Sequence, residues 1–186
     1  MTTRIAFVNG KGGVGKTTCA TLLAATLKDV GFSVSIEDRD PQGSATTAAN
    51  VFGLLTGTEG QIIIVDTAPN IAAPETLDAI RSADLVILVT TPSPLDLATT
   101  AATARRIQDE RRGETRVLFN LVQTTNRFFN EMAGIAQEYP FPTLKNFLTR
   151  RTSFQVAQIA SLKGIPGPHK EEIIKVAIEI AKLLPR

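Results

Sequence analysis

A glycine-rich segment near the N-terminus has the residue types and spacing of a phosphate-binding loop. It fits the pattern G-x-x-x-x-G-K-[ST] without a mismatch and reads Gly10-Lys11-Gly12-Gly13-Val14-Gly15-Lys16-Thr17. Glycines let backbone N–H groups approach phosphate oxygens closely, and the N-terminus of the following helix adds its positive dipole end. In such a loop Lys16 reaches the β- and γ-phosphates, and the Thr17 hydroxyl binds Mg²⁺. The segment therefore predicts a site for a nucleoside triphosphate and its magnesium ion.

Aspartates follow two of the apolar runs that we expect to be strands. Asp66 ends the run 62–65, at the position of a Walker-B carboxylate that holds Mg²⁺, usually through water. Asp38 and Asp40 follow the preceding run, where a carboxylate could orient the attacking water or assist the metal. An aspartate at a strand end also commonly caps a helix or forms a turn. Because open α/β sheets bind ligands at the carboxyl ends of their strands, we expect the three side chains to converge on the glycine-rich loop.

Short β-branched runs alternate with helical stretches, which is typical of a parallel sheet covered on both faces. The expected strands are Ile5–Val8, Ser33–Glu37, Gln61–Asp66, Leu85–Thr90 and Val117–Val122. The expected helices are about Thr17–Val30, Ala45–Phe52, Pro74–Ser82, Leu95–Arg112 and Phe128–Glu138. We find no repeat, low-complexity tract or linker. The sequence therefore predicts an α/β P-loop NTPase fold, with a mostly parallel twisted sheet, helices on both faces and a single domain over residues 1–186.

Composition excludes several classes of protein. Cys19 is the only cysteine, which excludes a disulfide framework, a cysteine-ligated zinc site and an iron–sulfur cluster held by this chain alone. No apolar run reaches the roughly 18 residues of a membrane span, and the N-terminus does not look like a signal peptide, so we expect a cytoplasmic protein. The stretch 171–184 has one broad apolar stripe. Its glutamates balance its lysines, which favours packing on the sheet over a cationic membrane-surface helix.

The net charge of +2 hides a difference between the two halves of the chain. Residues 1–103 carry 6 Lys and Arg against 10 Asp and Glu, whereas residues 104–186 carry 14 against 8. Such asymmetry indicates a face that binds a polyanion. Arginines that simply decorate solvated helix faces would give the same composition, and both interpretations stay open.

Several segments resemble those of one ATPase superfamily. Lys11, the additional lysine within Lys-Gly-Gly-Val-Gly-Lys-Thr-Thr, makes residues 11–18 similar to the deviant Walker A motif of the ParA/MinD superfamily. Segment 38–46, Asp-Arg-Asp-Pro-Gln-Gly-Ser-Ala-Thr, resembles switch I of ParA-type partition ATPases, and segment 66–69 resembles their switch II. Residues 83–96 are similar to the small plasmid partition ATPases of the ParF kind.

This resemblance implies a homodimer that holds ATP and Mg²⁺ between its subunits. Lys11 would reach the phosphates of the partner subunit's ATP, whereas Lys16 would bind phosphate in its own chain. Thr17 would bind Mg²⁺, Asp66 would hold the metal through water, and Asp40 would hold the hydrolytic water next to the metal. The other loop residues implied in nucleotide binding are Gly12, Gly13, Val14, Gly15 and Thr18.

In this family slow ATP hydrolysis acts as a timer. ATP-bound dimers coat nucleoid DNA without sequence preference, and a centromere-binding partner of the ParB/ParG kind triggers hydrolysis and release. ParF-like members also assemble filaments. The resemblance therefore implies a nucleoid-associated DNA segregation ATPase with no stable membrane association. Its DNA-binding candidates are Arg150 and Arg151, which precede the segment 152–160. Arg127 and Lys145 are weaker candidates, and each of these side chains could instead be a solvated surface charge.

Two residues are candidates for contact with the nucleotide base. Pro92, in the loop after the run 85–90, and Asn120, at the end of the fifth expected strand, could line an adenine pocket. In MinD-like relatives an asparagine at a comparable strand end contacts the purine. A strand-end asparagine that caps a turn is the alternative.

The chain departs from the family pattern between Asp40 and Asp66. Only 25 residues separate them, and Gly53–Gly60 is expected to be a turn in place of the strand and helix usual there. Glu37 is also unexpected in a buried strand.

Three other functions remain to be compared with DNA segregation. A ParA-like positioner of protein cargo has the same sequence features, because the partner protein chooses the cargo. A MinD-like membrane-positioning ATPase would need a cationic C-terminal helix. A metabolic or redox enzyme on the same fold gives no reason for Lys11 together with Asp-Pro-Gln, and Cys19 is wrongly placed for the cluster of a nitrogenase-type iron protein.

Overall fold

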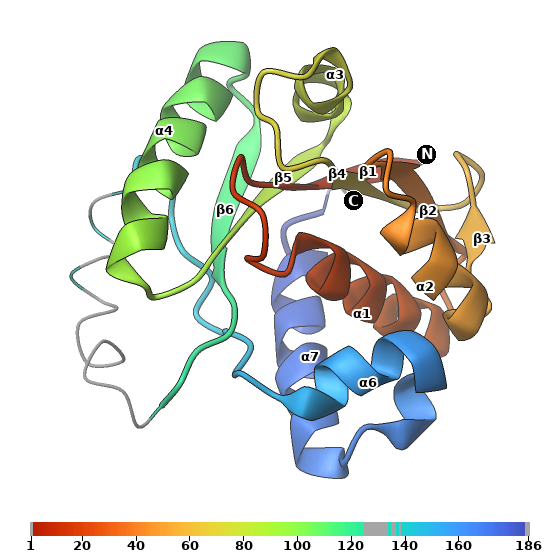
Figure 1. Cartoon of the computed structure of the whole chain (residues 1–186). Helices are drawn as coiled ribbons and strands as arrows, with labels where there is room; N and C mark the ends of the chain where they lie inside the picture. The colour runs from red at the N-terminus through yellow and green to blue at the C-terminus, as the bar shows by residue number, and fades with distance from the viewer. Residues whose placement is uncertain (1, 125–133, 135–136, 138, 185–186) are drawn as a thin grey trace.

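The computed structural model describes residues 2–124, 134, 137 and 139–184, and a parallel β-sheet lies at its centre. Within these residues the sheet has six strands: β1 (Thr3–Val8), β2 (Val34–Arg39), β3 (Leu55–Thr56), β4 (Ile62–Thr67), β5 (Leu85–Thr90) and β6 (Glu114–Phe119). Their order is β3-β2-β4-β1-β5-β6, and every pairing is parallel (Figure 1). The expected parallel α/β sheet is confirmed, and the strand order reverses beside β1, where such sheets bind ligands.

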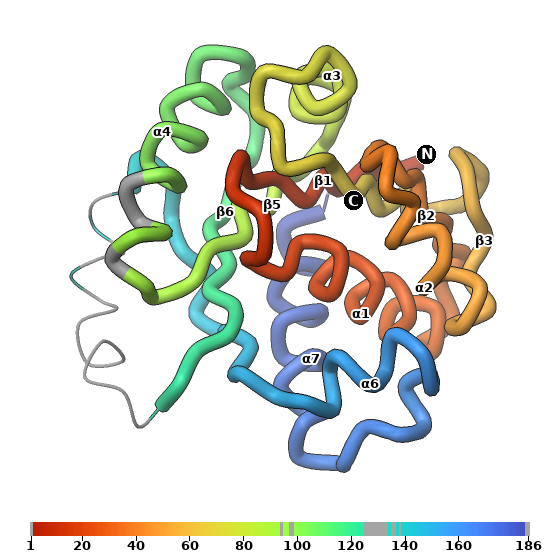
Figure 2. The backbone as a smooth tube through the Cα atoms, viewed as in Figure 1, coloured from red at the N-terminus to blue at the C-terminus, as the bar shows by residue number. Residues whose placement is uncertain are grey.

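Helices cover both faces of this sheet. One face carries α1 (Lys16–Asp29), α2 (Ser44–Phe52), α6 (Thr152–Ala160) and α7 (Gly167–Ala181), with a short 3-10 turn η1 (Leu162–Gly164) between the last two. The other face carries α3 (Pro74–Ser82) and α4 (Pro94–Glu110), which pack against each other. Figure 2 shows the same division in the backbone trace, with α1 among α2, α6 and α7 and separated from α3 and α4 by the sheet.

Alternate residues of β1 enter two separate apolar cores. Ile5 and Phe7 pack in the core formed with α1, α2, α6 and α7, whereas Ala6 and Val8 pack in the core formed with α3 and α4. All four side chains are fully buried. Because apolar side chains pack against both faces of β1, the strand is held firmly and fixes the position at which the following loop begins.

Part of the C-terminal apolar stripe joins the core, whereas Ile174 and Ile178 remain exposed. Four residues of α7 are buried in the same apolar cluster as residues of α1 and of the strands, namely Ile173, Val176, Ala177 and Ile180. The expected packing of this helix on the core is therefore confirmed. Among the described residues, no helix is both long and apolar enough to cross a membrane.

Three expectations differ from the structure. β6 begins three residues before the expected Val117, at Glu114, because this strand lies at the edge of the described sheet and its first residues need not be apolar. The expectation of a plain turn at Gly53–Gly60 was wrong: the segment contains β3, which pairs with Ser35 and Ile36 of β2. The expected helix Phe128–Glu138 lies outside the described residues, apart from positions 134 and 137, and so does Arg127.

The unexpected Glu37 is neutralised by two arginines. Its carboxylate pairs with Arg4 of β1 at 2.5 Å and with Arg39 at 2.6 Å. Arg39 in turn pairs with Asp78 of α3 at 2.6 Å. The end of β2 is therefore tied to the opposite helical layer, close to the segment that resembles switch I.

Candidate functional site

The glycine-rich loop leaves β1 and enters α1, as the sequence predicts. Gly13 and Gly15 have φ angles of 80° and 87°, in the left-handed region that disfavours residues with a Cβ atom. At Gly15 a Cβ atom would also lie 2.2 Å from Nδ2 of Asn120. That amide donates a hydrogen bond to the carbonyl of Val14 at 2.9 Å. Asn120 therefore fastens the loop to the end of β6.

The ammonium group of Lys16 lies within the loop. It donates a hydrogen bond to the carbonyl of Lys11 at 3.2 Å, and the residue is only 7% exposed. Burial lowers the pKa of Lys16, although the charges of Asp66 and Asp40 act in the opposite direction. A bound phosphate would favour the charged ammonium as these carboxylates do. Lys16 is therefore suited to bind an anion.

Thr17 and Asp66 bring a hydroxyl and a carboxylate together beside the loop. The Thr17 hydroxyl donates to Oδ2 of Asp66 at 2.6 Å, and Asp66 is fully buried at the end of β4. Burial raises the pKa of Asp66 to about 7, against the opposing effects of the Thr17 hydrogen bond and the Lys16 charge. Within the described residues the other oxygen, Oδ1, has no hydrogen-bond partner. A hydroxyl beside a buried carboxylate with a free oxygen fits Mg²⁺, which prefers hard oxygen ligands and retains several waters.

The two aspartates at the carboxyl end of β2 have different surroundings: Asp38 lies within the strand and Asp40 follows it. Asp38 accepts backbone hydrogen bonds from Asp40 at 3.1 Å and from Thr46 of α2 at 2.8 Å, so its carboxylate holds the turn and the start of α2. Asp40 accepts one from the backbone of Gln42 at 3.0 Å and borders the cavity above the loop. Of the two, Asp40 is therefore the one available for chemistry in that cavity.

A cavity of about 330 Å³ opens above the glycine-rich loop. It is lined by loop residues, by the switch-like segments and by the start of α6, namely Gly12, Gly13, Gly15, Lys16, Thr17, Thr18, Asp40, Pro69, Asn120, Leu121, Arg151, Phe154 and Gln155. Most of the predicted site residues thus meet at one place. Pro92 is half-buried and is not among the lining residues, whereas the buried Asn120 is.

The two arginines proposed for DNA binding lie in different surroundings. Arg150 is exposed. Arg151 lines the cavity and pairs with Glu172 of α7 at 3.1 Å. Sequence reasoning did not single out Phe154 or Gln155, because α6 reaches the loop only through its packing on α1 and α2.

Lys11 points away from the cavity of its own chain. Its ammonium pairs with Asp96 at the start of α4, and its side chain is 36% exposed. It does not line the cavity that holds Lys16. The two lysines of the loop therefore have separate environments.

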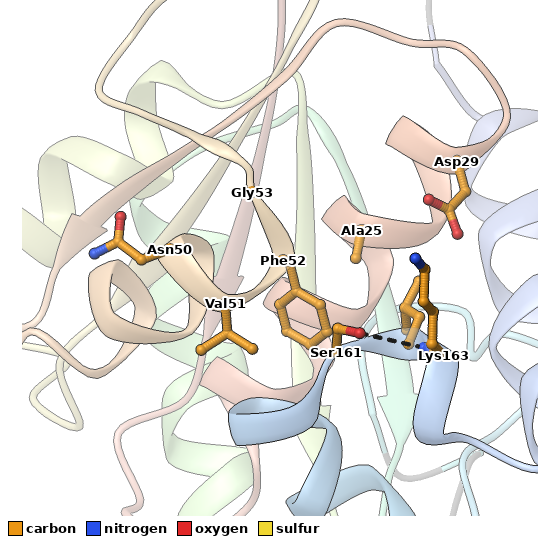
Figure 3. Close-up of a pocket in the computed structure, with 9 residues that line it drawn as sticks. Ala25, Asp29, Asn50, Val51, Phe52, Gly53, Ser161 and Lys163 are labelled. Carbon is orange, nitrogen blue, oxygen red and sulfur yellow. Dashed lines mark hydrogen bonds between the residues drawn. The ribbon is translucent and has the colours of Figure 1, made fainter.

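A second hollow, of about 390 Å³, lies at the other end of α1 (Figure 3). The last residues of α1 and α2 and the start of η1 border it, among them Asp29, Asn50, Ser161 and Lys163. None of the loop residues or motif aspartates lines it. The nucleotide-site hypothesis therefore concerns the cavity above the loop.

Comparison with known proteins gives a family and a shared fold. A family model described as the CobQ/CobB/MinD/ParA nucleotide binding domain matches residues 5–161. The chain is similar to the maintenance of carboxysome distribution protein A of Gloeobacter kilaueensis, with 38% identity over 120 residues. That match covers 55% of this chain and 55% of the relative, so the chain spans about half the relative's length.

Two solved structures have the same fold. A plasmid partition protein from Borrelia burgdorferi matches with a TM-score of 0.74 and 16% identity, over 97% of this chain and 98% of its own. Cobyrinic acid a,c-diamide synthase from Mycobacterium smegmatis, with bound ATP analog and magnesium, matches with a TM-score of 0.78 and 18% identity, over 98% of this chain and 95% of its own.

Proposed function

Because this chain belongs to the CobQ/CobB/MinD/ParA nucleotide-binding family, we propose that it is a switch ATPase that segregates DNA. It is a nucleotide-binding ATPase that uses ATP and Mg²⁺. In the proposed cycle two copies pair on ATP, bind DNA without sequence preference and separate after slow hydrolysis. A centromere-binding protein of the ParB/ParG kind stimulates that hydrolysis.

The position of Lys11 is the observation that carries this proposal. Lys16, Thr17 and Asp40 line one cavity, and the buried Asp66 lies behind Thr17, but the second loop lysine lies outside the cavity. Phosphoryl transfer depends on positive charge around the transferred group. If a second copy supplies the Lys11 ammonium, each site is complete only in the pair, and a single chain hydrolyses ATP slowly.

The remaining site residues have roles that follow from their surroundings. Lys16 binds the β- and γ-phosphates, Thr17 binds Mg²⁺ and Asp66 holds the ion's water. Asp40 orients the attacking water, since its neighbour Asp38 is occupied by two backbone hydrogen bonds. Asn120 and the α6 residues Phe154 and Gln155 border the space left for the base.

DNA binding is proposed for the two arginines that precede α6, Arg150 and Arg151. Arg150 is exposed, and its chain neighbour Arg151 lines the nucleotide cavity. Contacts of this kind give sequence-independent affinity that falls with salt. In this arrangement Arg150 and Arg151 would link the nucleotide bound in the cavity to the DNA bound on the surface of the protein.

Positioning of protein cargo is the second candidate. It is favoured by the 38% identity to a protein named for carboxysome distribution, although the match covers about half of each chain. Membrane positioning has less support, because four apolar residues of α7, Ile173, Val176, Ala177 and Ile180, are buried in the core and its glutamates balance its lysines.

The test of the proposed switch is sedimentation velocity with ADP and with a non-hydrolysable ATP analogue. Wild type should be monomeric with ADP and dimeric with the analogue and Mg²⁺. Lys11→Ala should bind the analogue yet stay monomeric, whereas Lys175→Ala, at an exposed lysine of α7, should behave as wild type. A Lys11→Ala protein that dimerises normally would contradict the proposal.

DNA binding is tested separately, with arbitrary duplex DNA at several salt concentrations. Arg150→Ala should weaken binding and reduce the salt slope by about 1, as expected for one lost phosphate contact. Arg105→Ala, at an exposed arginine of α4, is the matched control. If the salt dependence of DNA binding were unchanged in Arg150→Ala, Arg150 would not contact DNA, and the DNA-binding surface would have to lie elsewhere on the protein.

A further inference from the structure

The first residues of the glycine-rich loop are fastened to α4 and to the end of β5. The side-chain amide of Asn9 donates to the carbonyl of Val89 at 2.7 Å and to the Thr100 hydroxyl at 3.0 Å. The backbone N–H of Lys11 donates back to Oδ1 of Asn9 at 2.9 Å. The Lys11 side chain therefore leaves the loop from a fixed position, and only its own rotation decides where its ammonium group lies.

In this structure the ammonium of Lys11 lies at Asp96, in the first turn of α4. One carboxylate oxygen of Asp96 pairs with the ammonium, and the other accepts a hydrogen bond from the Thr91 hydroxyl at 2.6 Å. The Asp96 side chain is 11% exposed. Both oxygens of Asp96 are thus engaged and largely shielded from water, while the Lys11 side chain remains partly exposed.

A lysine ammonium has three N–H donors but occupies one position at a time, so the Asp96 carboxylate and the phosphates of a second copy would compete for it. We propose that Asp96 binds the Lys11 ammonium in the unpaired chain and thereby opposes ATP-driven pairing. This inference rests on the proposed function, in which Lys11 must reach the triphosphate of a second copy. Asp96 is a positioning residue, since it acts through Lys11 and does not line the nucleotide cavity. Pairing then begins with transfer of the ammonium from a carboxylate of its own chain to the phosphates of its partner.

The experiment measures the dimer dissociation constant by sedimentation, with a saturating non-hydrolysable ATP analogue and Mg²⁺. Asp96→Asn keeps the shape of the side chain and an acceptor for Thr91 but removes the charge that holds Lys11. We expect pairing to become at least about tenfold tighter, because each of the two unpaired copies loses one modest charged contact. Asp109→Asn, at an exposed aspartate on the same helix, should leave pairing unchanged.

The double variant separates this inference from the proposed function. If Asp96 acts through Lys11, Asp96→Asn should give no gain in a Lys11→Ala background. Equal gains in both backgrounds, or pairing that is unchanged or weakened by Asp96→Asn alone, would overturn the role of Asp96 while leaving the switch intact. Normal pairing of Lys11→Ala would instead overturn the proposed function itself.

Discussion

Replacing Gly15 by alanine tests how the nucleotide loop is held in place. The substitution meets two obstacles: a φ angle of 87° and a Cβ atom that would lie 2.2 Å from Nδ2 of Asn120. A left-handed conformation costs a residue with a Cβ atom about 1–2 kcal/mol. The Asn120 amide can turn away only by giving up its bond to Val14, which costs a further ~1–3 kcal/mol for a buried group. The free energy of unfolding should therefore fall by about 2–5 kcal/mol in total.

Gly13 provides the matched control. Its φ angle of 80° is nearly the same, but nothing lies within 4 Å of the position of a Cβ atom. Gly13→Ala should therefore cost only the ~1–2 kcal/mol of backbone strain. The assay is urea unfolding without nucleotide, which keeps any loss of phosphate binding out of the comparison.

Asn120→Ala completes the test as a double-mutant cycle. Without the amide, the cost of Gly15→Ala should shrink to that of Gly13→Ala, because only the backbone strain remains. The reasoning would be refuted if Gly15→Ala were no more costly than Gly13→Ala, or if its cost were the same with and without Asn120.

Three further predictions concern the site and the C-terminal helix. Lys16→Ala should abolish nucleotide binding measured by calorimetry, because it removes the buried cation of the loop; unchanged affinity would argue against the site. Asp66→Asn should remove the part of the nucleotide-induced rise in melting temperature that depends on Mg²⁺, while the rise without metal persists; an intact Mg²⁺ effect would exclude Asp66 from the metal site. Burial alone would raise the pKa of Glu172, but hydrogen bonds from Thr149 and Arg151 outweigh it and lower the pKa. The stability from these contacts is therefore present above the unfolded pKa of about 4.3 and is lost as pH falls through the folded value. Glu172→Gln should cost about 1 kcal/mol near neutral pH, after allowance for solvent screening, and the difference from wild type should vanish in acid; a difference that persists in acid would rule out the charge as its source.

The central strands and the loop could be predicted because their signals are local. Ile62–Val65 is a continuous apolar run, as a strand buried on both faces requires, and Lys16 and Thr17 occupy fixed places in a short motif. The predicted start of β6 was three residues too late, because this edge strand begins with polar residues such as Glu114 and Arg116. The two-residue β3 has no pattern of its own and forms because β2 offers a free edge.

Other parts of the site depend on contacts between distant segments. Asp38 and Asp40 are equivalent in sequence, and only the start of α2 distinguishes them, through the backbone of Thr46. The same holds for Asp96, which meets Lys11 across 85 residues of chain. An acidic residue in the first turn of a helix is usually explained by the helix dipole, so nothing in the sequence connects Asp96 with the loop.

The central claim is that the Lys11 ammonium acts on the nucleotide of a second copy. Its most direct test is the ATPase rate of a mixture of two inactive proteins, Lys11→Ala and Lys16→Ala. In a mixed pair, Lys11→Ala holds ATP through its intact Lys16, and the Lys16→Ala copy donates the missing Lys11. We predict that mixing restores hydrolysis well above the sum of the separate rates. A mixture no more active than its two components would contradict action between subunits.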